Sequence, residues 1–176
     1  PTDATATADA YKQAAAAGIK IVFMDQRADG LEAGKDYVSV VSADNYGNGY
    51  ASGTVLGDAL GGKGKVAMVG DGINDAPALT RAENQVSKVE GATDYLEKNY
   101  PDIEIVTEQG FTDESGCAEQ GDAILTQFPN IDGIYASWDV PMEGVLSAVR
   151  AAGMEGKVTL ACNDLGNNVA REIASG

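Results

Sequence analysis

Hydrophobic residues in this chain gather in six short runs, and longer stretches with helical spacing separate most of them. The runs are four to six residues long and rich in valine and isoleucine: 19–24, 37–41, 65–69, 103–106, 131–136 and 157–161. Short continuous apolar runs are typical of strands that are buried on both faces of a parallel sheet. The pattern therefore predicts six strands.

The stretches between these runs place apolar residues three and four positions apart and are rich in alanine, leucine, glutamate and lysine. They predict helices over 4–17, 46–60, 76–99, 114–127, 140–152 and 165–174. Alternating strands and helices form βαβ units, so we predict an α/β fold of parallel sheets with helices on both faces. The glycine-rich segment 61–64 is the most flexible connector, and there we predict the boundary between two lobes, 1–62 and 63–176.

Polar residues follow nearly every predicted strand. Ligands of parallel sheets bind beyond the carboxyl ends of the strands, so these positions form the candidate site. They are Asp25 to Arg27, Ser42 to Asn45, Gly70 to Gly72, Gln109 to Asp113, Ser137 to Asp139, and Asn163 with Asp164. Helix capping explains about half of the short polar side chains, but it does not explain Trp138, a large ring just before a predicted N-cap residue, Asp139.

Carboxylates beside an aromatic ring favour a carbohydrate site. The hydroxyl groups of a sugar match Asp and Asn side chains, and its C–H face stacks on a ring. An analogue that lacks a hydroxyl would leave polar groups of the site unpaired, so such a site discriminates between sugars. The alternative is a scaffold without a ligand, in which these residues only cap helices.

Composition and charge exclude several other classes of function. The chain has 176 residues, with 12 basic and 27 acidic side chains and a formal net charge of −15. Nucleic acid and anionic membranes need clustered positive charge, so neither is a predicted partner. The chain has no histidine, which excludes an imidazole base, a catalytic triad and a histidine metal ligand. We predict no enzymatic activity, no cofactor and no metal site.

Cys117 and Cys162 lie far apart and outside any CxxC pattern. We expect one buried thiol and one half-exposed thiol rather than a disulfide, while spacing leaves the pairing open. No apolar run approaches the ~20 residues that span a bilayer. The chain shows no signal peptide, and we expect any targeting signal outside this chain. Direct membrane insertion is therefore not predicted.

The segment "VGDGINDAPAL" resembles the hinge motif of P-type ion pumps and haloacid-dehalogenase-like enzymes, in which an aspartate helps to hold Mg²⁺. Such phosphoryl transfer also needs a nucleophilic aspartate with an acid or threonine two residues later, but Arg27 follows Asp25 at that distance. Phosphoryl transfer is therefore the lesser alternative. The acidic residues of 71–75 lack the ligand spacing of a calcium loop, and we interpret them as a turn and a helix cap; contact of Asp71, Asn74 or Asp75 with a ligand or cation stays open.

Six blocks of the sequence, in order, resemble the periplasmic sugar-binding proteins of the ribose and galactose type, the type I solute-binding proteins of ABC importers. The blocks include "PTDATATADAYKQAAAAGIKIVFMD", "ILTQFPNIDGIYASWDVPMEGVLSAVRAAG" and "KVTLACND". The resemblance implies the periplasmic-binding-protein-like I fold, in which two lobes close on a sugar, with the hinge expected near Gly61–Gly64. Members of that family are much longer, so the chain resembles a fragment: 1–62 would be the remaining part of the first lobe, and 63–176 the second lobe without its final return crossover.

The resemblance also implies ligand-binding residues. Asp25 matches an aspartate that follows a first-lobe strand, and Asp139 and Asp164 match two aspartates of the second lobe. The predicted ligand-binding set is Asp25, Gln26, Asn84, Trp138, Asp139, Asn163 and Asp164.

Three positions depart from the family pattern. Trp138 stands where the family has an asparagine, and Gln26 stands where the ribose binders have an arginine. The second-lobe arginine of the family has no clean match, and the residues around its position are Arg81, Asn84, Gln85 and Lys88. These departures leave the identity of the sugar open.

The resemblance implies a receptor that captures a sugar or a sugar-like polyol and delivers it to the membrane permease of an ABC importer. It implies a periplasmic or extracellular location, with lipid anchoring through residues outside the chain as an option. Sugar-sensing effector domains of bacterial transcription regulators share the fold and many of these blocks, and they are the alternative.

Overall fold

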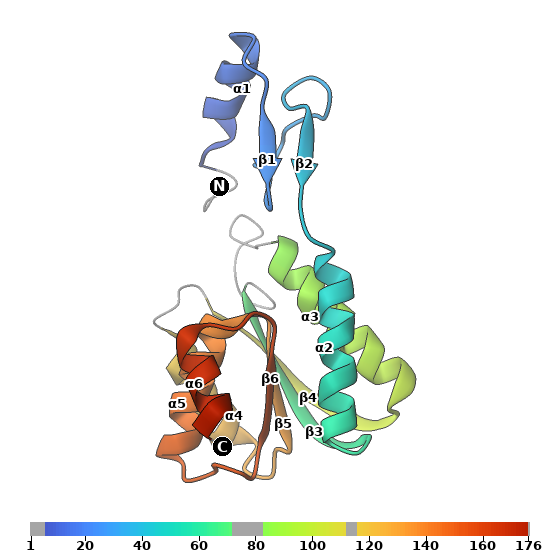
Figure 1. Ribbon diagram of the computed structural model, residues 1–176, viewed down its shortest axis with the longest axis vertical. Coiled ribbons are helices and arrows are strands. Elements are labelled where there is room, and N and C mark those ends of the chain that lie inside the picture. Colours follow the sequence, from blue (N-terminus) through green and yellow to red (C-terminus); the bar gives the residue numbers. More distant parts are fainter. Residues whose placement is uncertain (1–5, 72–82, 112–115, 176) are drawn as a thin grey trace.

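The computed structural model describes residues 6–71, 83–111 and 116–175, and Figure 1 shows their arrangement. All six predicted strands are present, and they are β1 (Val22–Met24), β2 (Ser39–Val41), β3 (Lys63–Asp71), β4 (Asp102–Phe111), β5 (Gly133–Ala136) and β6 (Thr159–Cys162). The helices are α1 (Ala8–Ala16), α2 (Asn45–Ala59), α3 (Glu83–Asn99), α4 (Cys117–Gln127), α5 (Asp139–Ala151) and α6 (Asn167–Ser175).

The strands form two parallel sheets. β1 pairs with β2, and the larger sheet has the order β4-β3-β5-β6. Helices α2 and α3 pack on one face of the larger sheet, and α4 and α5 pack on the other (Figure 1). These features confirm the predicted α/β class.

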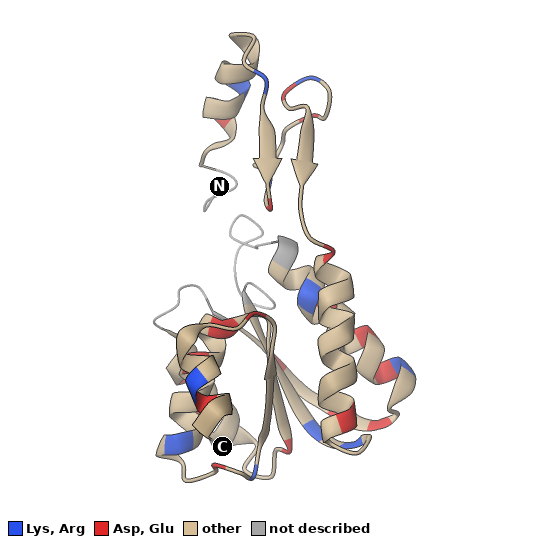
Figure 2. Ribbon diagram, viewed as in Figure 1, with Lys and Arg blue, Asp and Glu red and all other residues tan. Residues whose placement is uncertain are grey.

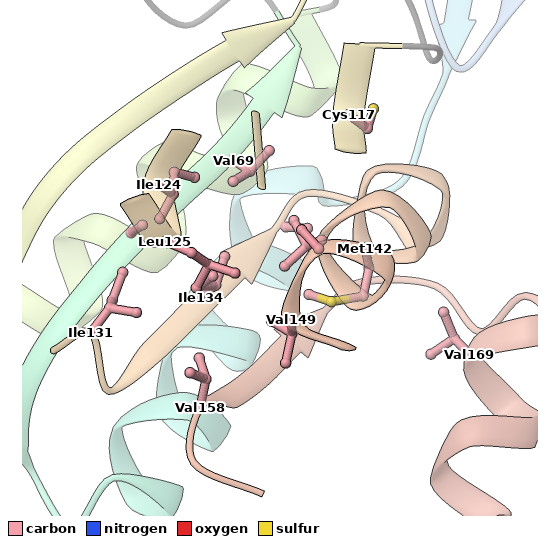
Figure 3. Packing of buried hydrophobic residues seen from close by; sticks show 14 residues of the cluster. Val69, Cys117, Ile124, Leu125, Ile131, Ile134, Met142, Val149, Val158 and Val169 are labelled. Atoms are coloured by element: carbon pink, nitrogen blue, oxygen red, sulfur yellow. The ribbon is translucent and has the colours of Figure 1, made fainter. Parts of the chain in front are cut away.

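The larger sheet is buried on both faces, which explains the continuous apolar runs in the sequence. Ala67 and Val69 of β3 pack with α4 and α5, whereas Val66 and Met68 pack with α2 and α3. Figure 3 shows the first of these clusters, in which side chains of α4 and α5 surround Ile134 of β5. Parallel strands with both faces covered place all their carboxyl ends at one edge, where ligands of this architecture bind.

Helix α2 packs closely against α3 because both helices carry glycine at the contact. A Cβ on Gly53 would lie 2.8 Å from the carbonyl oxygen of Ala92, and a Cβ on Gly49 would collide with the carbonyl group of Lys88. Leu56 of α2 is fully buried in the same cluster as Met68. Helix α2 thus shares its core with the larger sheet, and the predicted boundary between residues 62 and 63 stays a prediction.

The smaller sheet has its own core. Phe23 of β1 is buried under α1, and its ring meets the ring of Tyr11 edge to face, with 4.8 Å between the ring centroids. The other side of this sheet is open, because Val22, Met24 and Val41 are exposed. The segment 42–44 connects this sheet to α2.

Candidate functional site

Asp25 directly follows β1 and has an unusual backbone conformation. Its φ is +69°, in the left-handed region, while its N–H donates to the carbonyl oxygen of Val41 over 2.7 Å. The N–H of Gln26 then donates to the carbonyl oxygen of Met24 over 2.9 Å, which turns the chain sharply. The turn lines a cavity of about 300 Å³, together with residues of β2, α2 and α3: Asp25, Gln26, Arg27, Tyr37, Val40, Ser42, Asn45 and Ser87.

Trp138 and Asp139 follow β5, and their roles in helix capping differ from the prediction. Trp138, not Asp139, occupies the N-cap position of α5, with φ −159° and ψ −177° and no side-chain hydrogen bond to the helix. Asp139 is instead the first residue of the helix. The ring of Trp138 is half-buried and packs against the core beneath α5, so its remaining surface is what a sugar could stack on.

The carboxylate of Asp139 lies against Gly166. A Cβ on Gly166 would collide with Oδ2 of Asp139, so only glycine permits this approach. Gly166 directly precedes α6, and a negative charge at the N-terminus of a helix is favourable. Asp139 therefore has a structural role at the start of α6, in addition to its predicted role in binding a ligand.

Asn163 and Asp164 follow β6, next to the end of β5. The hydroxyl of Tyr135 donates to Oδ1 of Asn163 over 2.5 Å. Asp164 has a φ of +68°, and one of its carboxylate oxygens lies 3.4 Å from Nζ of Lys88. The side chain of Lys88 is only 7% exposed and that of Asp164 is 58% exposed, so the ion pair compensates a buried ammonium group and leaves carboxylate surface available.

Lys88 was only one of several residues that the sequence placed near the missing arginine. The sequence signal that could have singled out Lys88 among these residues is its position three residues before Gly91. Gly91 lets α3 approach α2, since a Cβ there would collide with the carbonyl oxygen of Tyr46. One turn earlier, Lys88 is held in the layer between the helix and the sheet, where it meets the end of β6.

Two groups beside Asp164 hold their protons strongly. Burial raises the pKa of the Cys162 thiol to about 11, and the carboxylates of Asp139 and Asp164 contribute to this shift. Burial also raises the pKa of Tyr135 far above its usual value. Both cysteines are free thiols, Cys117 buried and Cys162 half-buried, as the sequence led us to expect.

The structure brings most of the predicted site residues to the carboxyl edge of the sheets. Trp138, Asp139, Asn163 and Asp164 follow the neighbouring strands β5 and β6. Asp25 and Gln26 follow β1, and their cavity includes Ser87, the residue before Lys88. Helix α3 thus contacts both the residues that follow β1 and the residues that follow β6. Asp164 also borders a larger cavity of about 590 Å³, which is mainly apolar and lies between α2, β6, α5 and α6.

Two predictions fall outside what the structure describes. Asn84 lies in the first turn of α3, but its side chain is outside the described part. The same holds for the side chain of Asp71 and for all of 72–82, which includes Asn74 and Asp75. Within the described residues, no helix is long and apolar enough to cross a membrane.

A family model matches the chain along its whole length. The model is that of the periplasmic binding protein domain, and it covers residues 1–176. The chain therefore belongs to the periplasmic binding protein family, whose members are extracytoplasmic.

One similar protein is named for sugars, and another has a sugar bound in its crystal structure. The chain is 29% identical over 160 residues to the D-ribose/D-allose-binding protein of Pseudomonas aeruginosa, which covers 90% of the chain and 48% of that protein. It is also similar to an ABC transporter periplasmic solute binding protein from Actinobacillus succinogenes, whose crystal structure contains bound D-allose. The sequence identity is 33% and the TM-score is 0.74, and the match covers 91% of the chain and 55% of that protein. The chain thus spans about half the length of both relatives.

A third similarity concerns an ion pump. The chain is 31% identical over 90 residues to calcium-transporting ATPase 1 of Yarrowia lipolytica, but the match covers only 51% of the chain and 10% of the pump. Phosphoryl transfer also lacks the acid or threonine two residues after Asp25. The phosphoryl-transfer alternative is therefore not supported.

Proposed function

We propose that the protein is an extracytoplasmic solute-binding protein that captures a sugar or a sugar-like polyol between two lobes. It would deliver this ligand to the membrane permease of an ABC importer, from the periplasm or the cell exterior, with lipid anchoring through residues outside the chain as an option. The relatives that bind D-allose or are named for D-ribose and D-allose support a monosaccharide. The transcription-regulator alternative gains no support from the three relatives described above.

The backbone conformation of two aspartates carries this proposal. Asp25 and Asp164 are the two non-glycine residues with positive φ within the described part of the chain, and both were predicted to bind the ligand. A left-handed residue costs of order 1–3 kcal/mol, and such residues cluster where function needs them, although Asp tolerates the conformation better than most. One of these residues ends β1 and the other ends β6, so each sheet presents one of these carboxylates at its carboxyl edge.

The remaining residues would complete the site. Gln26 would accompany Asp25, whereas Trp138 would stack on the sugar, and Asp139, Asn163 and Asn84 would bind hydroxyl groups. Lys88 would hold Asp164 in place and donate to the ligand. A ring beside several carboxylates matches both the apolar face and the hydroxyl edge of a sugar.

Thermal unfolding in the presence of sugars tests the proposal. A ligand that binds only the folded protein at 100 times its Kd stabilises it by about 2.7 kcal/mol, so D-allose or D-ribose should raise the Tm. Trp138→Ala and Asp164→Ala should abolish this rise. Phe128→Ala and Asp122→Ala are matched controls, because Phe128 borders the same core and Asp122 is exposed on α4, away from the strand ends.

Two results would contradict the proposal. The first is the absence of any Tm rise across a panel of pentoses, hexoses, deoxysugars and polyols. The second is a rise that persists unchanged in both site variants, which would place binding elsewhere.

A further inference from the structure

Ser137 carries a buried hydroxyl group that no part of the proposed site uses. The residue follows β5 directly, is fully buried, and its Oγ has no hydrogen-bond partner among the described residues. Its N–H donates to the carbonyl oxygen of Val69 over 3.0 Å, so the alternation of the strand continues through it. The Ser137 side chain therefore points to the same face as Tyr135, towards α2 and α3.

Gln85 carries a second polar atom without a partner, and it faces the same layer. Its Oε1 is buried and has no hydrogen-bond partner among the described residues. Gln85 precedes Val89 by four residues and Ala92 by seven, and both of these pack against the sheet. Residues at this spacing share one face of a helix, so Gln85 also faces the sheet.

Both residues lie towards the carboxyl edge of the sheet. The hydroxyl of Tyr135 is 3.5 Å from the carbonyl oxygen of Lys88 and donates to Oδ1 of Asn163, so Lys88 lies near the ends of β5 and β6. Ser137 is two residues beyond Tyr135, and Gln85 is one turn before Lys88, on a helix that runs opposite to the strand. Both steps lead towards the carboxyl edge of the sheet, where the proposed sugar site lies.

The sheet carries small and polar residues at this level. Gly70 of β3 is the neighbour of Ser137, because the pairing of Val69 with Ala136 continues by one residue, and it has no side chain. Asn163 is the neighbour on the other side, since Ala136 pairs with Cys162. A glycine, a serine and an asparagine thus follow Met68, Tyr135 and Ala161 of the layer below.

We propose that Ser137 Oγ and Gln85 Oε1 form a polar subsite, together with Asn163, that binds one hydroxyl group of the sugar. A hydroxyl group both donates and accepts, so it can accept from Ser137 and donate to Gln85. A buried polar group without a partner costs about 1–3 kcal/mol, and a ligand that supplies the partner recovers this free energy on binding. The subsite determines specificity, because a sugar without that hydroxyl leaves both atoms unpaired. This inference rests on the proposed function.

Ser137→Ala tests the subsite, with calorimetric titration of D-allose and D-ribose and urea denaturation of the same samples. We expect Ser137→Ala to bind the sugar that reaches the subsite about tenfold more weakly, because one hydrogen bond is lost. The stability of the free protein should be unchanged or higher. Monodeoxy analogues of that sugar identify the hydroxyl. The analogue that lacks the hydroxyl bound by the subsite should have the same affinity for the wild type and for Ser137→Ala. The other analogues should still bind Ser137→Ala about tenfold more weakly than the wild type.

Thr93→Val is the matched control. Thr93 also lies on α3 with a buried Oγ1 that has no partner among the described residues, but it is two turns further from the carboxyl edge. Removing its hydroxyl should leave the affinity unchanged. If the wild type and Ser137→Ala bind the sugar with equal affinity while Trp138→Ala does not bind it, the subsite is overturned and the proposed function stays intact. Failure of the wild type to bind any sugar of the panel would overturn both.

Discussion

Asp164 combines two demands on a single residue, a left-handed backbone and a carboxylate that pairs with Lys88. Asparagine tolerates the left-handed region, whereas the left-handed conformation destabilises alanine by about 1–2 kcal/mol. Both substitutions remove the charge. Comparison of the two variants therefore separates the backbone requirement from the electrostatic one.

We predict that Asp164→Ala is less stable than Asp164→Asn by about 1 kcal/mol in urea denaturation. Both variants should lose sugar affinity, because both lack the carboxylate. The same pair of substitutions at Asp122, in the middle of α4, should give the opposite order, since alanine favours a helix more than asparagine does. Equal stability of the two Asp164 variants would contradict a cost of the left-handed backbone.

Cys162 makes stability depend on alkaline pH. The folded protein keeps the thiol protonated up to a pKa of about 11, whereas the unfolded chain releases the proton near 9.0. The folded state thus binds more protons in this window, and the free energy of unfolding falls as the pH rises from 9 to 11. Urea denaturation between pH 7 and 11 should show this loss, and Cys162→Ala should reduce its slope. An unchanged slope in the variant would assign the loss to other groups, such as Tyr135.

The contact between α2 and α3 is the element on which the position of Lys88 depends. Gly49 meets the backbone of Lys88, and Gly91 meets the backbone of Tyr46. Glycine at these positions lets the helices approach at backbone distance, and a methyl group there must push them apart. The packing of two helices thus determines where a buried ammonium group meets β6.

We predict that Gly49→Ala destabilises the protein by about 1–3 kcal/mol, the usual cost of overpacking. It should also weaken sugar binding, because α3 carries Lys88 and Gln85. Gly116→Ala is the control: a Cβ there meets nothing within 4 Å, and its φ of −79° suits alanine. Urea denaturation and calorimetric titration measure both effects. Gly49→Ala with wild-type stability would mean that the helices separate freely.

At the scale of the whole molecule, the packing of α2 bears on the position of the hinge. Helix α2 shares a core with the larger sheet, and the exposed segment 42–44 connects it to the smaller sheet. We propose that the lobes move about 42–44 rather than about Gly61–Gly64. A hinge at Gly61–Gly64 would have to shear α2 from α3, where glycines hold the two backbones in contact.

Hydrogen exchange measured with and without D-allose tests this proposal. We predict that α2 is as protected as α3 in both states, because amides of one packed unit open together. The change on adding sugar should concentrate at 42–44 and at the strand ends. A change centred on 61–64, with α2 exchanging independently of α3, would support the boundary between residues 62 and 63 instead.

The distribution of charge agrees with a small neutral ligand. In the view of Figure 2, lysine and arginine residues are scattered over several elements of the described part rather than gathered on one face. The net charge of −15 opposes association with polyanions. A neutral sugar is recognised by hydrogen bonds and stacking, so its binding needs no patch of positive charge.

Local pattern determined much of the fold. The run 65–69 predicted β3, because burial on both faces leaves a continuous apolar run, and the spacing of 140–152 predicted α5, because burial of one helix face leaves a periodic pattern. The same reasoning placed Asp25 and Asp164 at the ends of strands. The exact start of α5 could not be predicted in this way, since Asp139 is a common N-cap residue and Trp138 is not.

Tertiary structure alone decided which of these residues meet. Lys88 and Asp164 are 76 positions apart, and their ion pair exists because α3 lies over the end of β6 at a depth that the α2 glycines set. The contact of Asp139 with Gly166 arises in the same way. Periodicity records which face of an element is buried, whereas the partner across the layer depends on how elements distant in sequence pack, and no local pattern contains that information.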